Sequence, residues 1–201
     1  MKKCIIIGKA NTGKSLFMIN FAEYLGLTTI TLNILRKKEP TLRKTYTIKD
    51  ARQYLSHHAP FKTLNIQYVT VEIPAVKRSK TIQLIDSGGL TEEIHEQYSI
   101  RKSMADTLFH LKRANIILHF VDPSSVFKRD ISTPGQIDFN IASYGSNRGN
   151  YAIIANKMDL PESQAGLKEI KRLFPNNLII PVSALKKTGF EEVKAFVSNA
   201  I

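Results

Sequence analysis

The chain has 201 residues, of which 43% are hydrophobic and 23% are charged. These proportions are those of ordinary globular proteins and exclude a disordered or collagen-like chain, and the length predicts one domain or a tight two-domain protein. Lysine and arginine number 29 against 17 acidic residues, giving a formal net charge of +12 that favours polyanionic partners. No apolar run approaches the roughly 20 residues needed to span a bilayer. The single cysteine, Cys4, predicts a cytoplasmic protein without internal disulfides.

Apolar strand patterns alternate with helical patterns along the chain, which predicts an α/β fold with a mostly parallel sheet of six strands. The strands are expected at residues 3–7, 64–73, 81–85, 116–121, 151–155 and 178–182. Helices are expected at residues 14–25, 98–113 and 162–174. A further helix should begin at Pro134, and the last one should follow Thr188-Gly189-Phe190-Glu191 and end near Asn199. A basic turn joins the second and third strands, so these two are expected to form an antiparallel hairpin. Residues 26–63, which include a helical pattern at 47–57, are too long for a simple connection.

The first motif is Gly8-Lys9-Ala10-Asn11-Thr12-Gly13-Lys14-Ser15, a P-loop pattern placed directly between a predicted strand and a predicted helix. Glycines in such a loop let backbone N–H groups turn toward phosphate oxygens, and the helix N-terminus adds the positive end of its dipole. Lys14 is expected to reach the β- and γ-phosphates, and the Ser15 hydroxyl to bind Mg²⁺. The motif with these flanks favours a nucleotide-phosphate site over a plain glycine-rich turn.

A second motif, Asn156-Lys157-Met158-Asp159, follows the strand at 151–155 at its C-terminal end, where open α/β sheets bind ligands. The Asp159 carboxylate can accept hydrogen bonds from the N1–H and the exocyclic amino group of guanine. Adenine offers no such pair and would leave a buried carboxylate unpaired. The alternative is a solvated turn before Pro161. Ser183-Ala184-Leu185 follows the last strand, where a backbone N–H can meet the guanine carbonyl.

A third motif, Asp86-Ser87-Gly88-Gly89, closes the strand at 81–85. The Asp86 carboxylate can hold Mg²⁺ through water, and the Gly89 N–H can meet a γ-phosphate. Because Asp-x-x-Gly occurs by chance in most proteins, only its placement after this strand is informative.

Taken in order, GKANTGKS, DSGG, NKMD and SAL resemble the motif series of small GTPase domains, in particular the bacterial Era, Obg and MnmE (TrmE) group of the translation-factor class. The resemblance covers nearly the whole chain. It implies a three-layer P-loop NTPase fold of the Ras-like type over residues 1–201 as a single domain, GTP and GDP as ligands, Mg²⁺ as cofactor and GTP hydrolysis. It also implies catalytic roles for Lys14, Gly89 and a switch threonine, and it leaves room for a nucleotide-dependent dimer.

The switch threonine of this family contacts Mg²⁺ and the γ-phosphate and is placed here by spacing. Thr63 lies 23 positions before Asp86, a span that just holds the hairpin, and the run Pro60-Phe61-Lys62-Thr63-Leu64 is similar to the Pro-Phe-Thr-Thr-Leu run of Obg proteins. We predict Thr63 as the switch threonine, with 26–63 as an extended switch region. The alternatives are an ordinary β-branched residue at 63 and three other threonines, Thr41, Thr45 and Thr47.

Leu90 follows Gly89 where Ras-like enzymes carry the glutamine that orients the attacking water. A leucine cannot orient water, so hydrolysis is expected to depend on another part of the chain, a partner or an ion. In the potassium-stimulated relatives that this P-loop resembles, an asparagine stands at the position of Asn11 and a hydrophobic residue replaces the glutamine. Asn11 is therefore a candidate K⁺ ligand, the alternative being that it only tolerates a left-handed backbone.

Charge and resemblance together favour a GTP switch whose partner is ribosomal RNA or a ribosome assembly particle. The basic pairs scattered along the chain fit solvated faces equally well, because no aromatic residues interleave with them in the sequence. The rival from another class is a nucleotide-gated interaction module with negligible turnover. A P-loop kinase is disfavoured by Asn156–Asp159, since kinases need no guanine-reading motif of this form.

Overall fold

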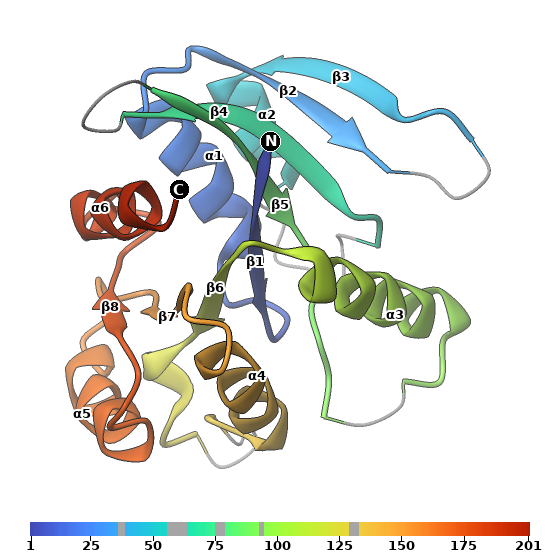
Figure 1. The fold of residues 1–201 in the computed structure, drawn as a ribbon. Coiled ribbons are helices and arrows are strands. Elements are labelled where there is room, and N and C mark those ends of the chain that lie inside the picture. The colour runs from blue at the N-terminus through green and yellow to red at the C-terminus, as the bar shows by residue number, and fades with distance from the viewer. Residues whose placement is uncertain (36–38, 56–63, 75–78, 93–94, 129–132) are drawn as a thin grey trace.

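The computed structural model of this protein describes residues 1–35, 39–55, 64–74, 79–92, 95–128 and 133–201. It has one mixed sheet of eight strands in the order β3-β2-β4-β5-β1-β6-β7-β8, with helices on both faces (Figure 1). The strands are β1 (Lys2–Gly8), β2 (Thr29–Ile34), β3 (Leu42–Thr47), β4 (Gln67–Ile73), β5 (Lys80–Asp86), β6 (Ile116–Val121), β7 (Tyr151–Ala155) and β8 (Ile179–Pro181).

The helices divide between the two faces of the sheet. Those with buried side chains in one core cluster are α1 (Lys14–Tyr24), α2 (Ile48–Leu55) and α6 (Phe190–Ala200). Those of the other cluster are α3 (Tyr98–Arg113), α4 (Gln136–Ser146) and α5 (Ser163–Leu173). A short 3₁₀ turn, η1, spans Pro123–Ser125. This three-layer α/β arrangement confirms the predicted fold class.

Strand β1 shows why the buried part of a central strand is apolar at successive positions. Its side chains alternate between the faces, so Cys4 and Ile6 enter the core cluster under α1, while Ile5 and Ile7 enter the cluster under α3 and α4. A strand covered on both faces needs apolar residues at every position. β1 pairs in parallel with β5 and with β6 and thus lies in the middle of the sheet.

The predicted antiparallel hairpin is confirmed as β4 and β5, whose register places Gln67 opposite Asp86. The predicted count of six strands with one antiparallel strand is wrong. Strands β2 and β3 add a second antiparallel hairpin to the edge of the sheet, so three of the seven strand pairings are antiparallel.

The additional hairpin arises from residues 26–63, which we expected to be an extended switch region. In β2, Ile30 and Leu32 are buried and alternate with exposed threonines, which is the pattern of a strand covered on one face. The outer strand β3 is mostly exposed and carries Arg43 and Lys44, charges that discourage edge-to-edge association. Helix α2 follows directly and packs on α1, while residues 36–38 and 56–63 lie outside the described part of the chain.

Helix α4 begins two residues later than predicted. Gln136 is its first residue, and the N–H of Gly135 donates to the Asp138 carboxylate at 2.9 Å. Pro134 therefore precedes the helix instead of occupying its first position. Within the described residues, no helix is both long enough and apolar enough to cross a bilayer.

Candidate nucleotide-binding site

The P-loop connects the end of β1 to the start of α1 and forms a closed ring of backbone groups. The Lys14 Nζ donates to the carbonyls of Gly8 at 3.1 Å and Lys9 at 2.5 Å, and the Thr12 hydroxyl donates to the same Lys9 carbonyl at 3.0 Å. Gly13 caps α1 with a φ of +87°, and a Cβ there would lie 2.3 Å from the Asn156 side chain. Only glycine fits both demands, because it lacks a Cβ and adopts positive φ freely.

The Lys14 side chain is buried beneath this loop. Burial lowers the pKa of Lys14 to about 8, because the charged ammonium is desolvated, and the nearby carboxylates of Asp86 and Asp138 oppose that shift. A cation held in a low-dielectric ring of carbonyls is strongly disposed to exchange these contacts for the oxygens of a polyphosphate.

Asp86 and Ser15, the two described residues that the sequence offers as Mg²⁺ ligands, meet next to Lys14. The Ser15 hydroxyl donates to Asp86 Oδ2 at 2.6 Å, and the Gln67 amide donates to the same oxygen at 2.9 Å. Asp86 Oδ1 is buried and has no hydrogen-bond partner among the described residues. Burial raises the pKa of Asp86, because the charged carboxylate is desolvated. Its Oδ1 atom has no hydrogen bond among the described residues to offset that cost. An unpartnered carboxylate oxygen beside a hydroxyl fits Mg²⁺, which prefers oxygen ligands.

Asn156 links the phosphate loop to the loop that follows β8. Its amide nitrogen donates to the Thr12 carbonyl at 2.8 Å, and its amide oxygen accepts the Ala184 N–H at 2.9 Å. The side chain is 1% exposed. Removing it would leave two buried backbone groups unpaired.

Asp159 lies beside the same loop, where its Oδ1 accepts the Ser183 hydroxyl at 2.5 Å. Ser183 is itself fixed by a backbone hydrogen bond to Thr188 and accepts the Lys186 N–H. Lys157 has a φ of +66° and pairs with Asp122 at 2.6 Å. The two sequence motifs Asn156–Asp159 and Ser183–Leu185 thus form one structure, which we call the base loops.

Gly89 and Leu90 pack directly against the P-loop. A Cβ at Gly89 would lie 2.7 Å from the Cα of Ala10, and the Leu90 N–H donates to the Gly8 carbonyl at 3.2 Å. The Leu90 side chain is buried in the core cluster under α3 and α4. Leu90 therefore serves packing at the position where a water-orienting glutamine would stand.

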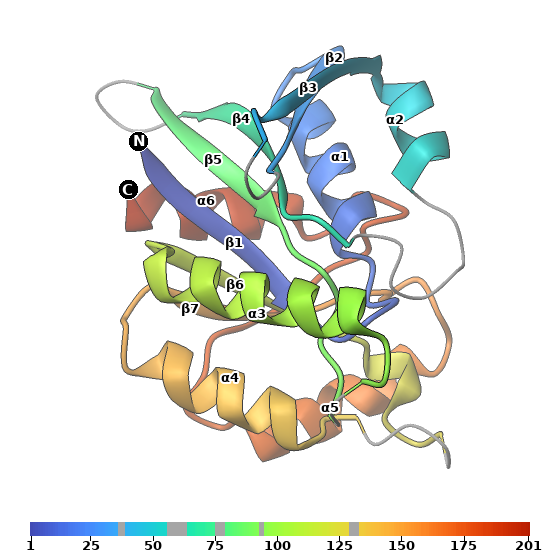
Figure 2. The same ribbon diagram turned by 90° about the vertical axis from the view of Figure 1, so that its right-hand side faces the viewer.

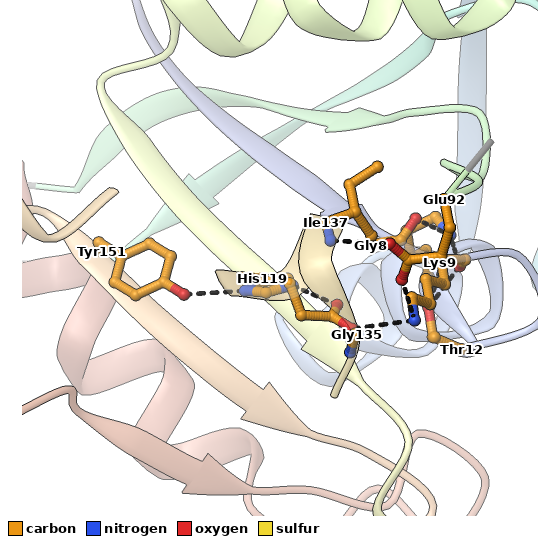
Figure 3. Close-up of polar contacts among 10 residues, drawn as sticks. Gly8, Lys9, Thr12, Glu92, His119, Gly135, Ile137 and Tyr151 are labelled. Carbon is orange, nitrogen blue, oxygen red and sulfur yellow. Dashed lines mark hydrogen bonds and ion pairs between the residues drawn. The ribbon is translucent and has the colours of Figure 1, made fainter. Parts of the chain in front are cut away.

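A chain of polar contacts, drawn in Figure 3, runs from the P-loop into the core. Lys9 Nζ pairs with Glu92 at 2.5 Å and with Asp138 at 3.3 Å. Glu92 also accepts the Ile137 N–H at 2.9 Å, at the start of α4. The Asp138 carboxylate also forms a hydrogen bond of 3.0 Å with Nε2 of the buried His119. The other ring nitrogen of His119, Nδ1, contacts the Tyr151 hydroxyl at 2.8 Å. The P-loop and the segment after Gly89 are thereby tied to α4.

Asp138 is the centre of this chain. Burial disfavours its charged form, but the His119 ring, the Gly135 N–H and the Lys9 ammonium outweigh burial and hold the Asp138 pKa below its ordinary value. His119 is fully buried and hydrogen-bonded, so it is a polar core residue that its position in an apolar strand did not reveal.

Replacing Asp138 with alanine is expected to lower the free energy of unfolding by about 3 kcal/mol, because the buried His119 Nε2 loses its partner, Lys9 loses one carboxylate partner, and α4 loses its cap. Asp138→Asn keeps the hydrogen-bonding shape and should lose about 1 kcal/mol. Since the folded-state pKa of Asp138 is depressed, the deficit of the asparagine variant should shrink as pH falls below 4. Urea denaturation measures both; equal stability of the alanine variant and the native chain would contradict this role.

The remaining predicted residues differ in how the structure places them. Asn11 is exposed with a φ of +60°, the left-handed conformation that asparagine tolerates. Thr63 lies outside the described residues. Thr45 and Thr47 belong to β3, four strand spacings or roughly 19 Å from β1, so these alternatives for the switch threonine do not reach the P-loop here.

Sequence reasoning missed three residues that support the site. Gln67 donates to Asp86, and Asn20 donates to the Ala184 carbonyl at 2.7 Å while accepting from Arg52 of α2 at 2.7 Å. None of the three stands in a motif. Only the register of β4 against β5 and the packing of α2 on α1 bring them to the site, and neither could be deduced from local patterns.

Comparison with known proteins shows the family to which the chain belongs. Residues 40–157 match the family described as 50S ribosome-binding GTPase. The chain belongs to this family. It is 29% identical over 126 residues to GTPase Obg of Shouchella clausii (strain KSM-K16), a match that covers 61% of the chain and 29% of Obg. It is 30% identical over 122 residues to the tRNA modification GTPase MnmE of Thermoanaerobacter sp. (strain X514), covering 60% of the chain and 24% of MnmE.

The chain therefore matches less than a third of the length of either relative. Among solved structures, Era of Aquifex aeolicus bound to GDP·AlF₄⁻ superimposes with a TM-score of 0.62 at 19% identity, over 100% of this chain and 57% of Era. A structure of Era with MgGDPNP and nucleotides 1506–1542 of 16S ribosomal RNA gives 0.58 at 17% identity, over 99% of this chain and 56% of Era. At these identities the likeness establishes the fold.

Proposed function

We propose that this chain binds GTP with Mg²⁺, hydrolyses it to GDP and phosphate, and acts as a switch on ribosomal RNA or a ribosome assembly particle. The observation that carries the nucleotide part is the Asn156 bridge. One buried amide joins the Thr12 carbonyl of the phosphate loop to the Ala184 N–H of the base loops. A triphosphate on the P-loop and a guanine beside Asp159 would thus occupy one preformed site.

The sequence motifs suggest the roles of individual residues, and the contacts described above support those of the described residues. The P-loop N–H groups and Lys14 hold the β- and γ-phosphates, while Ser15 and Asp86, with Thr63 as the switch ligand, hold Mg²⁺. Bound Mg²⁺ neutralises negative charge on the phosphate oxygens as it develops. The Gly89 N–H would donate to the γ-phosphate, and the Asp159 carboxylate would accept from the guanine edge. Asn156 positions the base loops, with Lys157 beside it.

Hydrolysis without a glutamine requires another source of positive charge near the γ-phosphate. Leu90 is buried and offers no polar atom, so we propose that K⁺ occupies this place with the Asn11 amide oxygen among its ligands. Asn11 is exposed at the rim of the P-loop, which leaves its side chain available to an ion. The competing explanation, that asparagine is present for its left-handed backbone, predicts no ion dependence.

Turnover at matched ionic strength is expected to be about tenfold or more faster in K⁺ than in Na⁺, equivalent to roughly 1.4 kcal/mol of transition-state stabilisation. Asn11→Gly keeps access to the positive φ but removes the oxygen, and should abolish the difference between the salts. Asn11→Asp keeps an oxygen and should retain part of it. Equal rates in K⁺ and Na⁺ for the native chain, or full K⁺ stimulation in Asn11→Gly, would remove the ion site.

The alternative function is a nucleotide-gated interaction module with negligible turnover, favoured by the absence of a water-orienting side chain at Leu90. Single-turnover hydrolysis of radiolabelled GTP separates the two, measured with Mg²⁺ and K⁺ and with or without ribosomal subunits. We expect Mg²⁺-dependent hydrolysis that the subunits accelerate. GTP that stays bound and intact under every condition would favour the module. The charge of +12 supports the ribosomal partner, as does the Era complex with 16S ribosomal RNA.

A further inference from the structure

The outer face of α3 is an exposed surface that the nucleotide site does not use. The helix packs onto the sheet through Ile100, Ser103, Thr107 and Leu111, which recur at helical spacing. Its opposite face lies toward the viewer in Figure 2, where no other element of the described chain crosses it. Three large apolar side chains stand out on this helix, with Tyr98 exposed by 72%, Leu108 by 53% and Phe109 by 52%.

Cationic side chains share this face. Along α3 there are four lysines and arginines against a single acidic residue, Asp106. The Arg113 guanidinium lies 3.8 Å from the centroid of the Phe109 ring, so the two form a stacked pair. Sequence reasoning found no aromatic residues interleaved with the basic pairs. That interpretation is wrong for α3, because residues four apart in sequence are neighbours on a helix.

A groove adjoins Phe109 on the side that faces the sheet. It has a volume of about 490 Å³. Lys102 and His110 line it from α3, and Asn65 lines it from the segment just before β4. The buried His110 Nδ1 has no hydrogen-bond partner within the described residues. Burial lowers the His110 pKa, as do the charges of Lys3 and Arg113. A neutral ring with one unused nitrogen can pair with the polar edge of a ligand.

We propose that the exposed face of α3 and its groove bind single-stranded RNA. This proposal rests on the function proposed above and identifies the surface that would contact its RNA partner. Phe109, with Arg113 over its ring, provides a platform on which a base stacks. Lys102, Lys112 and Arg113 contact phosphates, and the groove beside His110 takes an unpaired base. Single-stranded RNA is favoured over an acidic protein because flat aromatic faces, guanidinium groups and a pocket with polar edges are what unstacked bases require.

The end of α3 that carries this pair lies far from the P-loop. Asn115, just after the helix, donates to the Lys3 carbonyl at the start of β1. The P-loop follows the other end of that seven-residue strand, roughly 20 Å away. Substitutions at Phe109, Lys112 and Arg113 should therefore leave GTP hydrolysis unchanged, which separates failure of this surface from failure of the nucleotide site.

The test is fluorescence anisotropy with the full chain and a labelled, unstructured 20-nucleotide RNA over a series of salt concentrations. Lys112→Gln/Arg113→Gln should weaken binding by about tenfold or more near physiological salt and reduce the salt slope by roughly 0.7 for each lost phosphate contact. Phe109→Leu, which keeps an apolar side chain, should weaken binding about fivefold or more with little change in slope. GTP hydrolysis and thermal unfolding are measured on the same preparations.

A charge-matched control is Lys168→Gln/Lys171→Gln on α5, where both lysines are exposed. It should have a far smaller effect on RNA binding than the α3 pair. Equal weakening by the two pairs, or unchanged binding in Phe109→Leu, would overturn the proposal and leave only a diffuse basic surface. Stronger binding of an acidic peptide than of RNA, lost in the α3 variants, would overturn it in favour of a protein partner.

Discussion

Replacing Asp159 with asparagine is expected to lower GTP affinity by roughly a hundredfold and to raise the affinity for xanthosine triphosphate. The carboxylate is a double acceptor that matches the N1–H and amino group of guanine, and hydrogen bonds to a charged group contribute about 1.5–3 kcal/mol each. An asparagine amide would place an N–H donor opposite the amino group of guanine, which is also a donor, so the two cannot pair. The same N–H can donate to the C2 carbonyl of xanthine. Equilibrium titration of the two nucleotides measures the exchange.

The Ser183 contact makes this prediction sharper. Because the Ser183 hydroxyl donates to Asp159 Oδ1 at 2.5 Å, the asparagine oxygen can keep that bond, and its NH₂ group is then turned toward the base. Asp159→Ala serves as the control: it should lose GTP without gaining xanthosine triphosphate. An asparagine variant that loses GTP and gains nothing would place Asp159 in a structural role only.

Replacing Asp86 with asparagine is expected to slow GTP hydrolysis by about a hundredfold or more, because the negative ligand that holds Mg²⁺ is lost and the metal contributes several kcal/mol. The same variant should be at least as stable as the native chain without nucleotide. Asp86 is fully buried and its Oδ1 has no partner among the described residues, so removing the charge removes a desolvation cost.

Thermal unfolding with and without MgGDP, alongside single-turnover kinetics, checks both halves of this prediction. The native chain should gain stability from Mg²⁺ together with GDP, and the Asp86→Asn variant should gain less. Ser15→Ala is the companion variant, because it removes the other expected Mg²⁺ ligand, the P-loop hydroxyl, but leaves the buried Asp86 carboxylate in place. Full activity of Asp86→Asn at ordinary Mg²⁺ concentrations would exclude Asp86 from the metal site.

The parts of the fold that the sequence predicted correctly are those in which a local pattern and the tertiary environment agree. β1 is apolar at successive positions because both of its faces are covered, and its glycine-rich end is followed by a helix, so strand, loop and helix were all evident. The β4–β5 hairpin was predicted from two alternating runs around a basic turn, and the structure has them paired in that way.

The β2–β3 hairpin was missed although its pattern is present in the sequence. Ile30 and Leu32 alternate with threonines in β2, but Leu42–Thr47 is mostly polar because β3 is an edge strand with little to bury. An edge strand acquires its structure from the neighbour to which it bonds, and propensity alone does not distinguish it from a loop.

The candidate site shows the same division between local and distant information. Lys14, Ser15 and Asp86 were predicted because their motifs are contiguous and lie at strand ends. The chain of contacts through Lys9, Asp138 and His119 joins residues more than a hundred positions apart, and its members carry no common spacing. Only the parallel order of β1, β6 and β7 brings these side chains together.

The central claim is that the P-loop and the base loops form one site for a guanine nucleotide. Equilibrium competition against a fluorescent GDP analogue, with Mg²⁺ present and GTP, GDP or ATP as competitor, tests it most directly. A site whose carboxylate pairs with the guanine edge rejects a base that lacks these donors, so GTP and GDP should displace the probe at concentrations about a hundredfold lower than ATP. Displacement by ATP at the same concentration as GTP would contradict the claim.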